Sequence, residues 1–173
     1  MAHPTPHAPR RLPARVLLAT TLLVAVIDGA VALSSSAAEL KLDAAQQEAV
    51  GKLRAKGAAV AQVAAEDAAL SLNLALGAKS VGDTELALVG KLPNVVALDL
   101  RGTGVTDAGL AGIAGLTSLT RLNLERTGIT DAGLAHLKGL TNLAYLNLYG
   151  TAVTDAGVAQ LAGLKSLRRL YLW

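Results

Sequence analysis

The 173-residue sequence contains no cysteine and no phenylalanine, and its aromatic residues are one tryptophan and three tyrosines. Without cysteine there can be no disulfide, thiol nucleophile, cysteine-ligated zinc, iron–sulfur cluster or lipid-modified cysteine. With so few rings, the core must be built from the small aliphatic residues that supply most of the 52% hydrophobic content. Such a composition favours a repetitive architecture over an irregular globule.

The sequence also lacks a strong excess of either charge. Three of the 16 basic residues and one of the 13 acidic residues lie within residues 1–38, which leaves residues 39–173 with a net charge of +1. Binding to nucleic acid depends on a basic surface that contacts phosphates. We therefore expect no nucleic-acid partner.

Residues 1–38 have the composition of an export signal. Three arginines precede an uncharged run of twelve residues at 16–27, and small residues follow it. This order is typical of a secretory signal peptide. The alternative is an uncleaved membrane anchor at residues 16–33, but that stretch is shorter than the ~20 apolar residues of a spanning helix and contains Asp28. Cleavage is favoured, and the sequence predicts an exported protein, periplasmic or extracellular, or a membrane-anchored one if the leader is kept.

From residue 70 onwards the sequence repeats with a period of 24 residues. Two leucines separated by one residue recur, and so does the string Thr-Asp-Ala-Gly at 106–109, 130–133 and 154–157. The leucine columns are Leu98, Leu122, Leu146 and Leu170, and Leu100, Leu124, Leu148 and Leu172. A weaker first copy aligns Leu74, Leu76, Val81, Asp83 and Leu86. Residues 70–173 thus predict four repeats and the first strand of a fifth.

Each repeat predicts a strand followed by a short helix. Leu98 and Leu100 flank Asp99, and this alternation is typical of a half-buried strand. Thr106 and Asp107 supply a capping hydroxyl and a carboxylate at the start of a helix.

Other repeat positions predict packing and turn contacts. Leu110, Ile113 and Leu116 follow the helix start at a spacing of three, which places them on one helical face. A threonine column has a structural explanation, because buried hydroxyl groups must find hydrogen-bond partners in the turns. This column contains Thr103, Thr127 and Thr151.

The pattern L-x-L-x-x-T-x-[VI]-T-D-A-G-[LV], followed by L-x-x-L, resembles the leucine-rich repeat family in a bacterial variant of 24-residue period. The resemblance implies an α/β solenoid: a right-handed coil with a parallel β-sheet on the concave face and short helices on the convex face. One such unit cannot bury its hydrophobic side alone, so several units must stack.

The two ends of the stack require different chemistry. Residues 39–69 predict an N-terminal cap, with one helix over 43–57 and a strand over 58–63 that is joined to a second strand over 70–76 by a turn at Glu66 and Asp67. At the other end the sequence stops within a strand, so we expect either that the natural chain continues or that a second molecule covers the exposed end.

Strand residues between the leucines are expected to line the concave wall. In the first row these wall positions fall on Asn73, Ala75 and Gly77. All four aromatic residues occupy wall positions in the last two rows, flanked by arginines. Tyrosine, tryptophan and arginine are enriched where binding energy concentrates, although aromatic residues also simply suit strand surfaces. The predicted partner-binding residues are Arg121, Asn123, Tyr145, Asn147, Tyr149, Arg169, Tyr171 and Trp173.

The predicted function is an exported binding module that mediates protein–protein interaction through the concave face, with a protein or peptide ligand. The alternative is a structural envelope protein that self-associates through its open C-terminal repeat. An enzyme is not expected, because no nucleophile, acid–base pair or metal set can be assembled. No cofactor or metal is predicted either, since the recurring aspartates have a capping explanation and His136 stands alone in the repeats.

Overall fold

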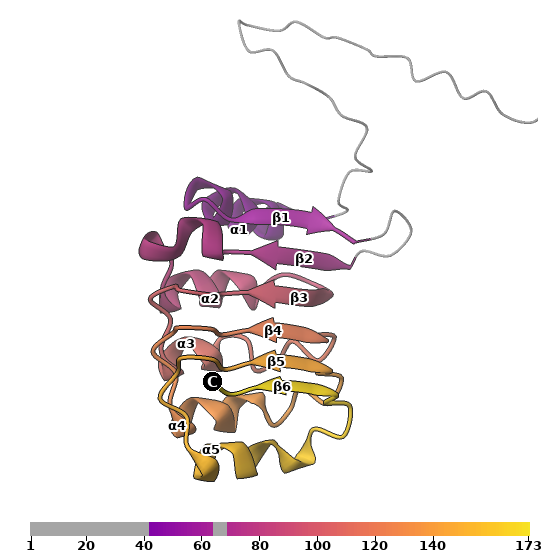
Figure 1. Cartoon of the computed structure of the whole chain (residues 1–173). Helices are drawn as coiled ribbons and strands as arrows, with labels where there is room; N and C mark the ends of the chain where they lie inside the picture. Colours follow the sequence, from indigo (N-terminus) through magenta and orange to yellow (C-terminus); the bar gives the residue numbers. More distant parts are fainter. Residues whose placement is uncertain (1–41, 64–68) are drawn as a thin grey trace, which may run out of the picture. The chain divides into compact units, whose positions relative to one another are not determined.

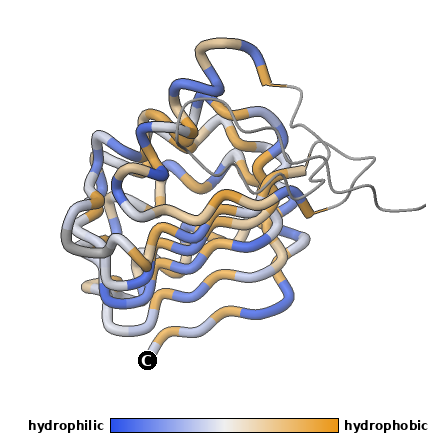
Figure 2. Tube along the Cα trace, turned by 90° about the horizontal axis from the view of Figure 1, so that it is seen from above, coloured by the Kyte–Doolittle hydropathy of each residue, from blue (hydrophilic) through white to orange (hydrophobic). Residues whose placement is uncertain are grey.

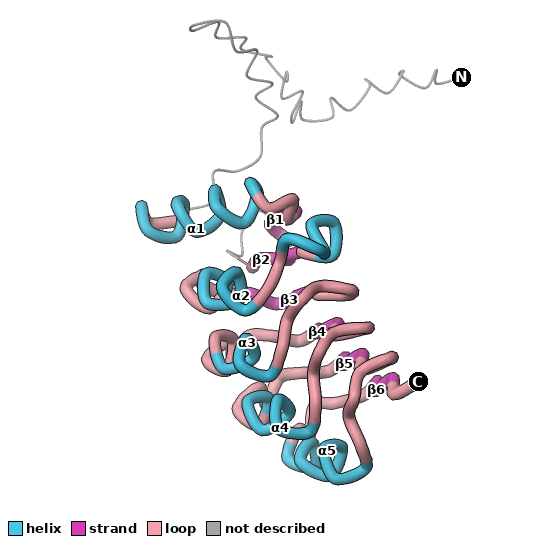
Figure 3. Tube along the Cα trace, turned by 90° about the vertical axis from the view of Figure 1, so that its left-hand side faces the viewer, coloured by secondary structure: helices cyan, strands magenta, loops and turns pink. Residues whose placement is uncertain are grey.

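The computed structural model describes residues 42–63 and 69–173, so the predicted leader and the predicted turn at residues 66–67 lie outside the described residues. These residues wind into stacked coils, with strands on one side and helices on the other (Figures 1 and 3). The helices are α1 (Ala44–Ala55), α2 (Asp83–Val89), α3 (Asp107–Ala111), α4 (Asp131–Leu134) and α5 (Asp155–Ala159). The strands are β1 (Ala59–Gln62), β2 (Leu70–Asn73), β3 (Val95–Asp99), β4 (Arg121–Asn123), β5 (Tyr145–Asn147) and β6 (Arg169–Tyr171). No helix in the two described ranges is long and apolar enough to cross a membrane.

The strands form one six-stranded sheet in the order of the sequence. From β2 to β6 each strand runs parallel to the next, and Leu98, Leu122, Leu146 and Leu170 lie opposite one another. The repeat period sets this register, because residues one period apart become neighbours on adjacent strands. β1 joins the first edge in the antiparallel sense. Parallel strands alternating with short helices confirm the predicted α/β solenoid.

The leucine columns form the core between the sheet and the helices. The leucine within each of β3, β4 and β5 and the leucine that follows the strand are at most 2% exposed, and Figure 2 shows hydrophobic residues at corresponding places in successive coils. These residues are Leu98, Leu100, Leu122, Leu124, Leu146 and Leu148. Burial of each leucine is worth ~1.5–3 kcal/mol, and it is achieved only because a neighbouring coil covers it.

The helical side of each coil contains apolar residues three positions apart. α3 ends at Ala111, so the helix predicted to carry Leu110, Ile113 and Leu116 is shorter than expected. Instead, the amides of Ile113, Leu116 and Leu119 each donate to the carbonyl three residues earlier, at 3.2, 3.0 and 2.9 Å. Turns of the 3₁₀ type have three residues per turn. This spacing therefore keeps all four apolar side chains on the buried side.

The first parallel strand departs from its predicted register. The period places Leu74 and Leu76 in the columns of Leu98 and Leu100, but β2 pairs Leu72 with Leu98. Leu76 is 72% exposed, whereas Leu74 is fully buried and occupies the column of Leu100. The predicted alignment of this row is therefore wrong by two residues.

Additional residues after β2 explain the shift. The chain forms a 3₁₀ helix over Ala75–Ser80 before it rejoins the repeat at Val81. The amide of Gly104 donates to the carbonyl of Val81 at 2.9 Å, as the amide of Gly128 does to that of Val105 at 3.0 Å. The spacing of 24 residues thus resumes at Val81, and the strand before it is displaced.

The predicted helix at residues 43–57 forms as α1, and its ends have the expected chemistry. Asp43 and Gln46 exchange side-chain and backbone hydrogen bonds of 2.8 and 3.0 Å at its start, which satisfies two otherwise unpaired amides. Gly57 follows its end with a φ of 87°. α1 buries Ala49, Val50 and Leu53 in the same core as the leucine columns.

The threonine column fills the structural role predicted for it. The hydroxyls of Thr103, Thr127 and Thr151 donate to the carbonyls of Leu100, Leu124 and Leu148, each at 2.6 Å. These bonds close the turn that follows each strand.

The Thr-Asp-Ala-Gly strings join each coil to the next. The carboxylate of Asp131 accepts hydrogen bonds from the amide and hydroxyl of Thr154, at 2.7 and 2.6 Å. Each threonine immediately precedes the helix of its own coil, so an aspartate of one coil lies at the helix start of the next, where negative charge is favoured. The same two bonds join Asp83 to Thr106 and Asp107 to Thr130.

The threonine hydroxyls were expected to cap their own helices, and the structure corrects this. Thr130 does so, since its hydroxyl accepts the amide of Ala132 at 3.3 Å, but Thr106 and Thr154 make no such bond. The main partner of each hydroxyl is the aspartate of the preceding coil.

Hydrogen bonds from the hydroxyl and amide of Thr154, together with the amide of Gly157, hold the pKa of Asp131 below its ordinary value.

Glycine is the last residue of each string because the aspartate of the preceding coil occupies the space that a side chain would need. A Cβ on Gly133 would overlap Oδ1 of Asp107, and Gly109 and Gly157 are obstructed in the same way. The first coil contains α2, and the described residues place no aspartate of a preceding coil ahead of this helix. Glu85 of α2 occupies the position that Gly109 occupies in α3. Its carboxylate accepts the amide of Gly82 at 2.8 Å and caps its own helix.

Replacement of Asp131 by Asn is expected to lower the melting temperature at pH 7. The lowered pKa means that the ionised carboxylate stabilises the fold above the ordinary pKa of aspartate and that this contribution disappears as pH falls through the folded-state pKa. The difference between Asp131→Asn and the wild type should therefore shrink below about pH 4. Thermal unfolding at several pH values measures this difference in melting temperature. Asp155→Asn is the control, because Asp155 makes no corresponding bond among the described residues, and equal effects of the two variants would disprove the role of the contact.

Replacement of Gly133 by Ala is expected to lower the free energy of unfolding by ~1–3 kcal/mol, as overpacking usually does. The new methyl group must displace the carboxylate of Asp107 from its hydrogen bonds. Urea denaturation measures the change. Gly51→Ala, in the middle of α1 with nothing within 4 Å of the added methyl, should instead stabilise the protein by roughly 0.5–1 kcal/mol.

Candidate functional site

The sheet surface away from the helices, here called the open sheet face, carries the residues that alternate with the buried leucines. Adjacent strands place these residues in columns. The first column contains Ser71, Ala97, Arg121, Tyr145 and Arg169, and the second contains Asn73, Asp99, Asn123, Asn147 and Tyr171. The third, two residues further along, contains Ala75, Arg101, Glu125, Tyr149 and Trp173. The predicted first row of Asn73, Ala75 and Gly77 is thus replaced by Ser71, Asn73 and Ala75, because of the shift of β2.

Four residues of the second column hold the backbone where strands β2 to β5 end. Oδ1 of Asn123 accepts the amide of Glu125 at 3.1 Å, and Oδ1 of Asn147 accepts that of Tyr149 at 3.0 Å. Asn147 is buried and also donates from Nδ2 to Glu125 at 3.3 Å. Asn73 and Asp99 make the same backbone contact. Two of the predicted binding residues, Asn123 and Asn147, therefore use polar atoms to orient the third column.

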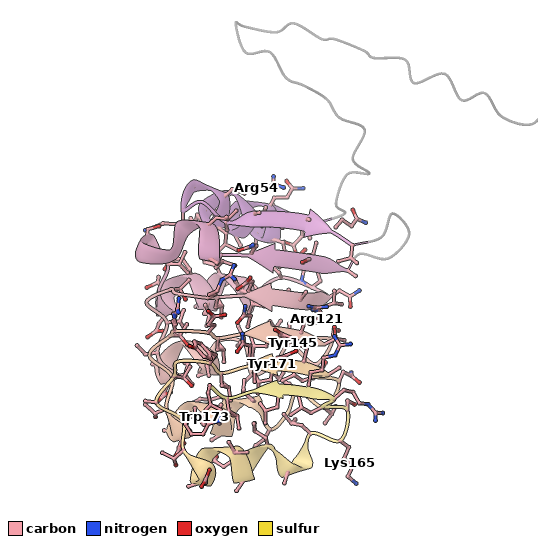
Figure 4. The ribbon with its side chains drawn as sticks, in the orientation of Figure 1. Arg54, Arg121, Tyr145, Lys165, Tyr171 and Trp173 are labelled. Atoms are coloured by element: carbon pink, nitrogen blue, oxygen red, sulfur yellow. The ribbon has the colours of Figure 1, made fainter. Side chains whose placement is uncertain are left out.

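A continuous row of large side chains crosses the last three strands. The guanidinium of Arg121 lies 4.9 Å from the ring centre of Tyr145, and the rings of Tyr145 and Tyr171 are 5.5 Å apart at 45°. Figure 4 shows these three residues following one another across β4, β5 and β6. Cation–π contacts and tilted ring pairs fix side-chain orientation. We call these three residues the aromatic row.

A second group gathers where the strands end. Tyr149, Tyr171 and Trp173 border a hollow of about 300 Å³ together with Glu125 and Asn147. Tyr149 is 40% exposed, Tyr171 48% and Trp173 92%. This hollow therefore offers ring faces to a partner beside a carboxylate.

Arg126 contributes to this group and has an unusual backbone. Its guanidinium lies 5.8 Å from the ring centre of Tyr149. Its φ is 53°, in the left-handed region that disfavours side chains. One period before and after it stand Gly102 and Gly150, with φ of 67° and 69°. The chain thus keeps an arginine where the coils on either side have glycine.

Replacement of Arg126 by Gly is expected to cost less stability than replacement of Arg101 by Gly, by about 1 kcal/mol, because only Arg126 has the strained left-handed backbone. Arg101 is the matched control, since it is also an exposed arginine just after a strand. Chemical denaturation of both variants measures the difference. Equal losses would show that the backbone of Arg126 carries no strain.

Another hollow lies further toward the N-terminus than the predicted site. It has a volume of about 550 Å³, and Ser71, Asn73, Ala97 and Asp99 contribute to its lining. Arg121 and Tyr145 line it as well. Small residues in the first rows leave this space open, whereas the large side chains of the later rows fill the space above their own strands. The aromatic row thus lies along one side of a depression that the sequence did not identify.

Seven of the eight predicted binding residues divide into three groups, and Arg169 stands apart from them. Arg121, Tyr145 and Tyr171 form the aromatic row, Tyr149 and Trp173 border the hollow at the strand ends, and Asn123 and Asn147 support the turns. Arg169 lines a third hollow of about 290 Å³ with Arg121 and Tyr145.

Two nearby residues escaped the prediction from the sequence, namely Arg126 and Arg168. Arg126 could have been found as the arginine in a glycine column. Arg168 gives no signal beyond its position next to Arg169.

The side chains of the open sheet face can stack and form hydrogen bonds. This face presents rings, guanidinium groups, amides and two carboxylates. Among the residues that the structure describes, no group of three or more histidine, aspartate or glutamate side chains could hold a metal ion.

Comparisons with known proteins agree with this architecture. Two leucine-rich repeat family models match residues 91–114 and 117–172. A search of curated proteins found no match.

Solved structures similar to the chain include two internalins from Listeria monocytogenes. Internalin C2 is 27% identical, with a TM-score of 0.42, over 60% of this chain and 50% of its own. The internalin inlF is 20% identical, with a TM-score of 0.36, over 49% of this chain and 30% of its own. The chain therefore matches half or less of the length of these proteins.

Family models over most of the repeats, leucine columns buried between coils and a parallel strand in each coil lead to one conclusion. The chain is a leucine-rich repeat protein.

Proposed function

We propose that this protein binds a protein or peptide partner on the open sheet face, through the aromatic row and the hollow at the strand ends. The leucine-rich repeat family and fold support a protein-interaction module in general. The finer assignment to this face rests on the arrangement of its side chains.

The observation that carries the proposal is where the aromatic residues lie. All four lie on the open sheet face, although the core of this protein is built from leucine. Tyrosine and tryptophan provide large contact areas with few rotatable bonds. Tyr145 and Tyr171 are further held by their contact with each other, so ordering them on binding costs less entropy.

The roles of individual residues follow from their contacts. Tyr145, Tyr149, Tyr171 and Trp173 provide the contact area, whereas Arg121 and Arg126 orient rings and offer hydrogen-bond donors. Asn123 and Asn147 act indirectly, since they hold the turns that carry Glu125 and Tyr149.

We also propose that the protein is exported and acts without catalysis. Export rests on the composition of residues 1–38. A non-catalytic role rests on the recognition chemistry of the open sheet face and on the usual role of leucine-rich repeat proteins as binding modules.

The double variant Tyr145→Ala/Tyr149→Ala tests the binding face. A peptide library is selected against the immobilised full chain, and the affinity of the selected peptides is measured by titration. Loss of two central aromatic contacts should weaken binding at least ~30-fold, because each such residue typically contributes 1–2 kcal/mol or more. The melting temperature should fall by only a few degrees, since both rings lie outside the leucine core.

Lys138→Ala is the control, because Lys138 is exposed on the side of the helices. Its affinity for the same peptides should equal that of the wild type. If the double variant binds as tightly as the wild type, the open sheet face is not the binding surface. If it unfolds, the single variant Tyr149→Ala, at the more exposed ring, decides the question.

A further inference from the structure

One hollow of the open sheet face is lined by arginines without acidic partners. It has a volume of about 290 Å³ and lies where the last strands begin, between Arg121 of β4, Tyr145 of β5 and the pair Arg168 and Arg169 at the start of β6. Thr120 and Ala144 complete its lining. Figure 4 shows Arg121 and Tyr145 at this side of the sheet.

The arginines are unpaired within the described part of the chain. The ion pairs there join Lys52 to Glu48, Lys56 to Glu85 and Arg101 to Asp99, and none involves the arginines of this hollow. The hydroxyl of Thr120, which donates to the carbonyl of Val96, carries no charge that could neutralise them. Three cations at one edge of a sheet are therefore available to a ligand.

From these observations we infer that the hollow takes the carboxylates of an acidic peptide, an inference that rests on the proposed function and names its class of partner. Guanidinium groups bind carboxylates through two parallel hydrogen bonds. The ring of Tyr145 adds an apolar surface for the neighbouring side chain of the peptide. The volume of about 290 Å³ lies at the lower end of the roughly 300–1,000 Å³ of small-molecule sites, and it has room for one or two side chains of a longer ligand.

The surrounding charges favour a peptide over a polyanion. Asp99 and Glu125 lie on the same open sheet face and would repel a long row of phosphates. The repeats as a whole are nearly neutral, whereas nucleic-acid-binding proteins extend their basic surface over many phosphates. The arginine hollow is instead a local positive site on a face that carries acidic side chains elsewhere.

The test uses the full chain and two labelled peptides, one alternating Glu and Leu and one alternating Gln and Leu, in fluorescence anisotropy titrations. The wild type should bind the Glu peptide at least about tenfold more tightly than the Gln peptide, because charged hydrogen bonds are stronger than neutral ones. The variant Arg121→Gln/Arg168→Gln/Arg169→Gln should lose this preference. Substitution of the same residues by Lys should restore it only in part, since Lys lacks the planar fork.

The matched control is Arg54→Gln/Lys91→Gln/Lys138→Gln, which removes the same charge from exposed residues outside the hollow and should keep the preference. Equal loss in both triple variants would overturn the inference, because net charge alone would then explain binding. Tighter arginine-dependent binding of single-stranded oligo(dT) would also overturn it, in favour of a polyanion site. If the two peptides bind equally, or if neither binds at millimolar concentration, the inference fails, while the capture experiment with Tyr145 and Tyr149 still decides the proposed function.

Discussion

The fold depends on burial of leucine between successive coils. A single coil has no second layer against which to pack its leucines, so each coil covers the next and the stack is the smallest stable unit. The register must then be held against sliding, because leucine columns alone can pack at several offsets. The bonds from the aspartate of one coil to the threonine of the next supply that directional constraint. Packing thus provides most of the free energy, and the hydrogen bonds select one arrangement.

This constraint also explains why some polar residues are fixed by contacts within the fold, whereas others on the open sheet face vary from row to row. Threonine and aspartate on the helical side are used in contacts between coils, and the asparagines of the second column are used to hold the turns. The fold does not need the side chains of the first and third columns to join coils or to hold turns, so these side chains vary from row to row. Large residues at Arg121, Tyr145 and Tyr149 are compatible with the fold because nothing in the core requires those positions.

Much of the fold was predictable from the sequence, since the leucine, threonine and glycine columns reflect local geometry that recurs in each coil. The register of β2 was not, because Leu72, Leu74 and Leu76 alternate equally well and the period selected the wrong pair. The string Leu-Asn-Leu at 72–74, which matches 122–124 and 146–148, held the missing signal. The partners of the aspartates could not be predicted either, since their own helices offered a sufficient explanation. For the candidate site, the columns located the aromatic residues, but the arginine hollow depends on side-chain positions across strands.

Glu85, at the position where later coils have glycine, restricts where the array could gain a coil by gene duplication. A duplicated unit placed after any coil finds an aspartate behind its helix and has the glycine that accommodates it. A unit placed before Asp83 would press its aspartate against the side chain of Glu85, because glycine is absent there. An additional coil can therefore be accommodated between or after the later coils, whereas one placed before Asp83 requires the side chain of Glu85 to move.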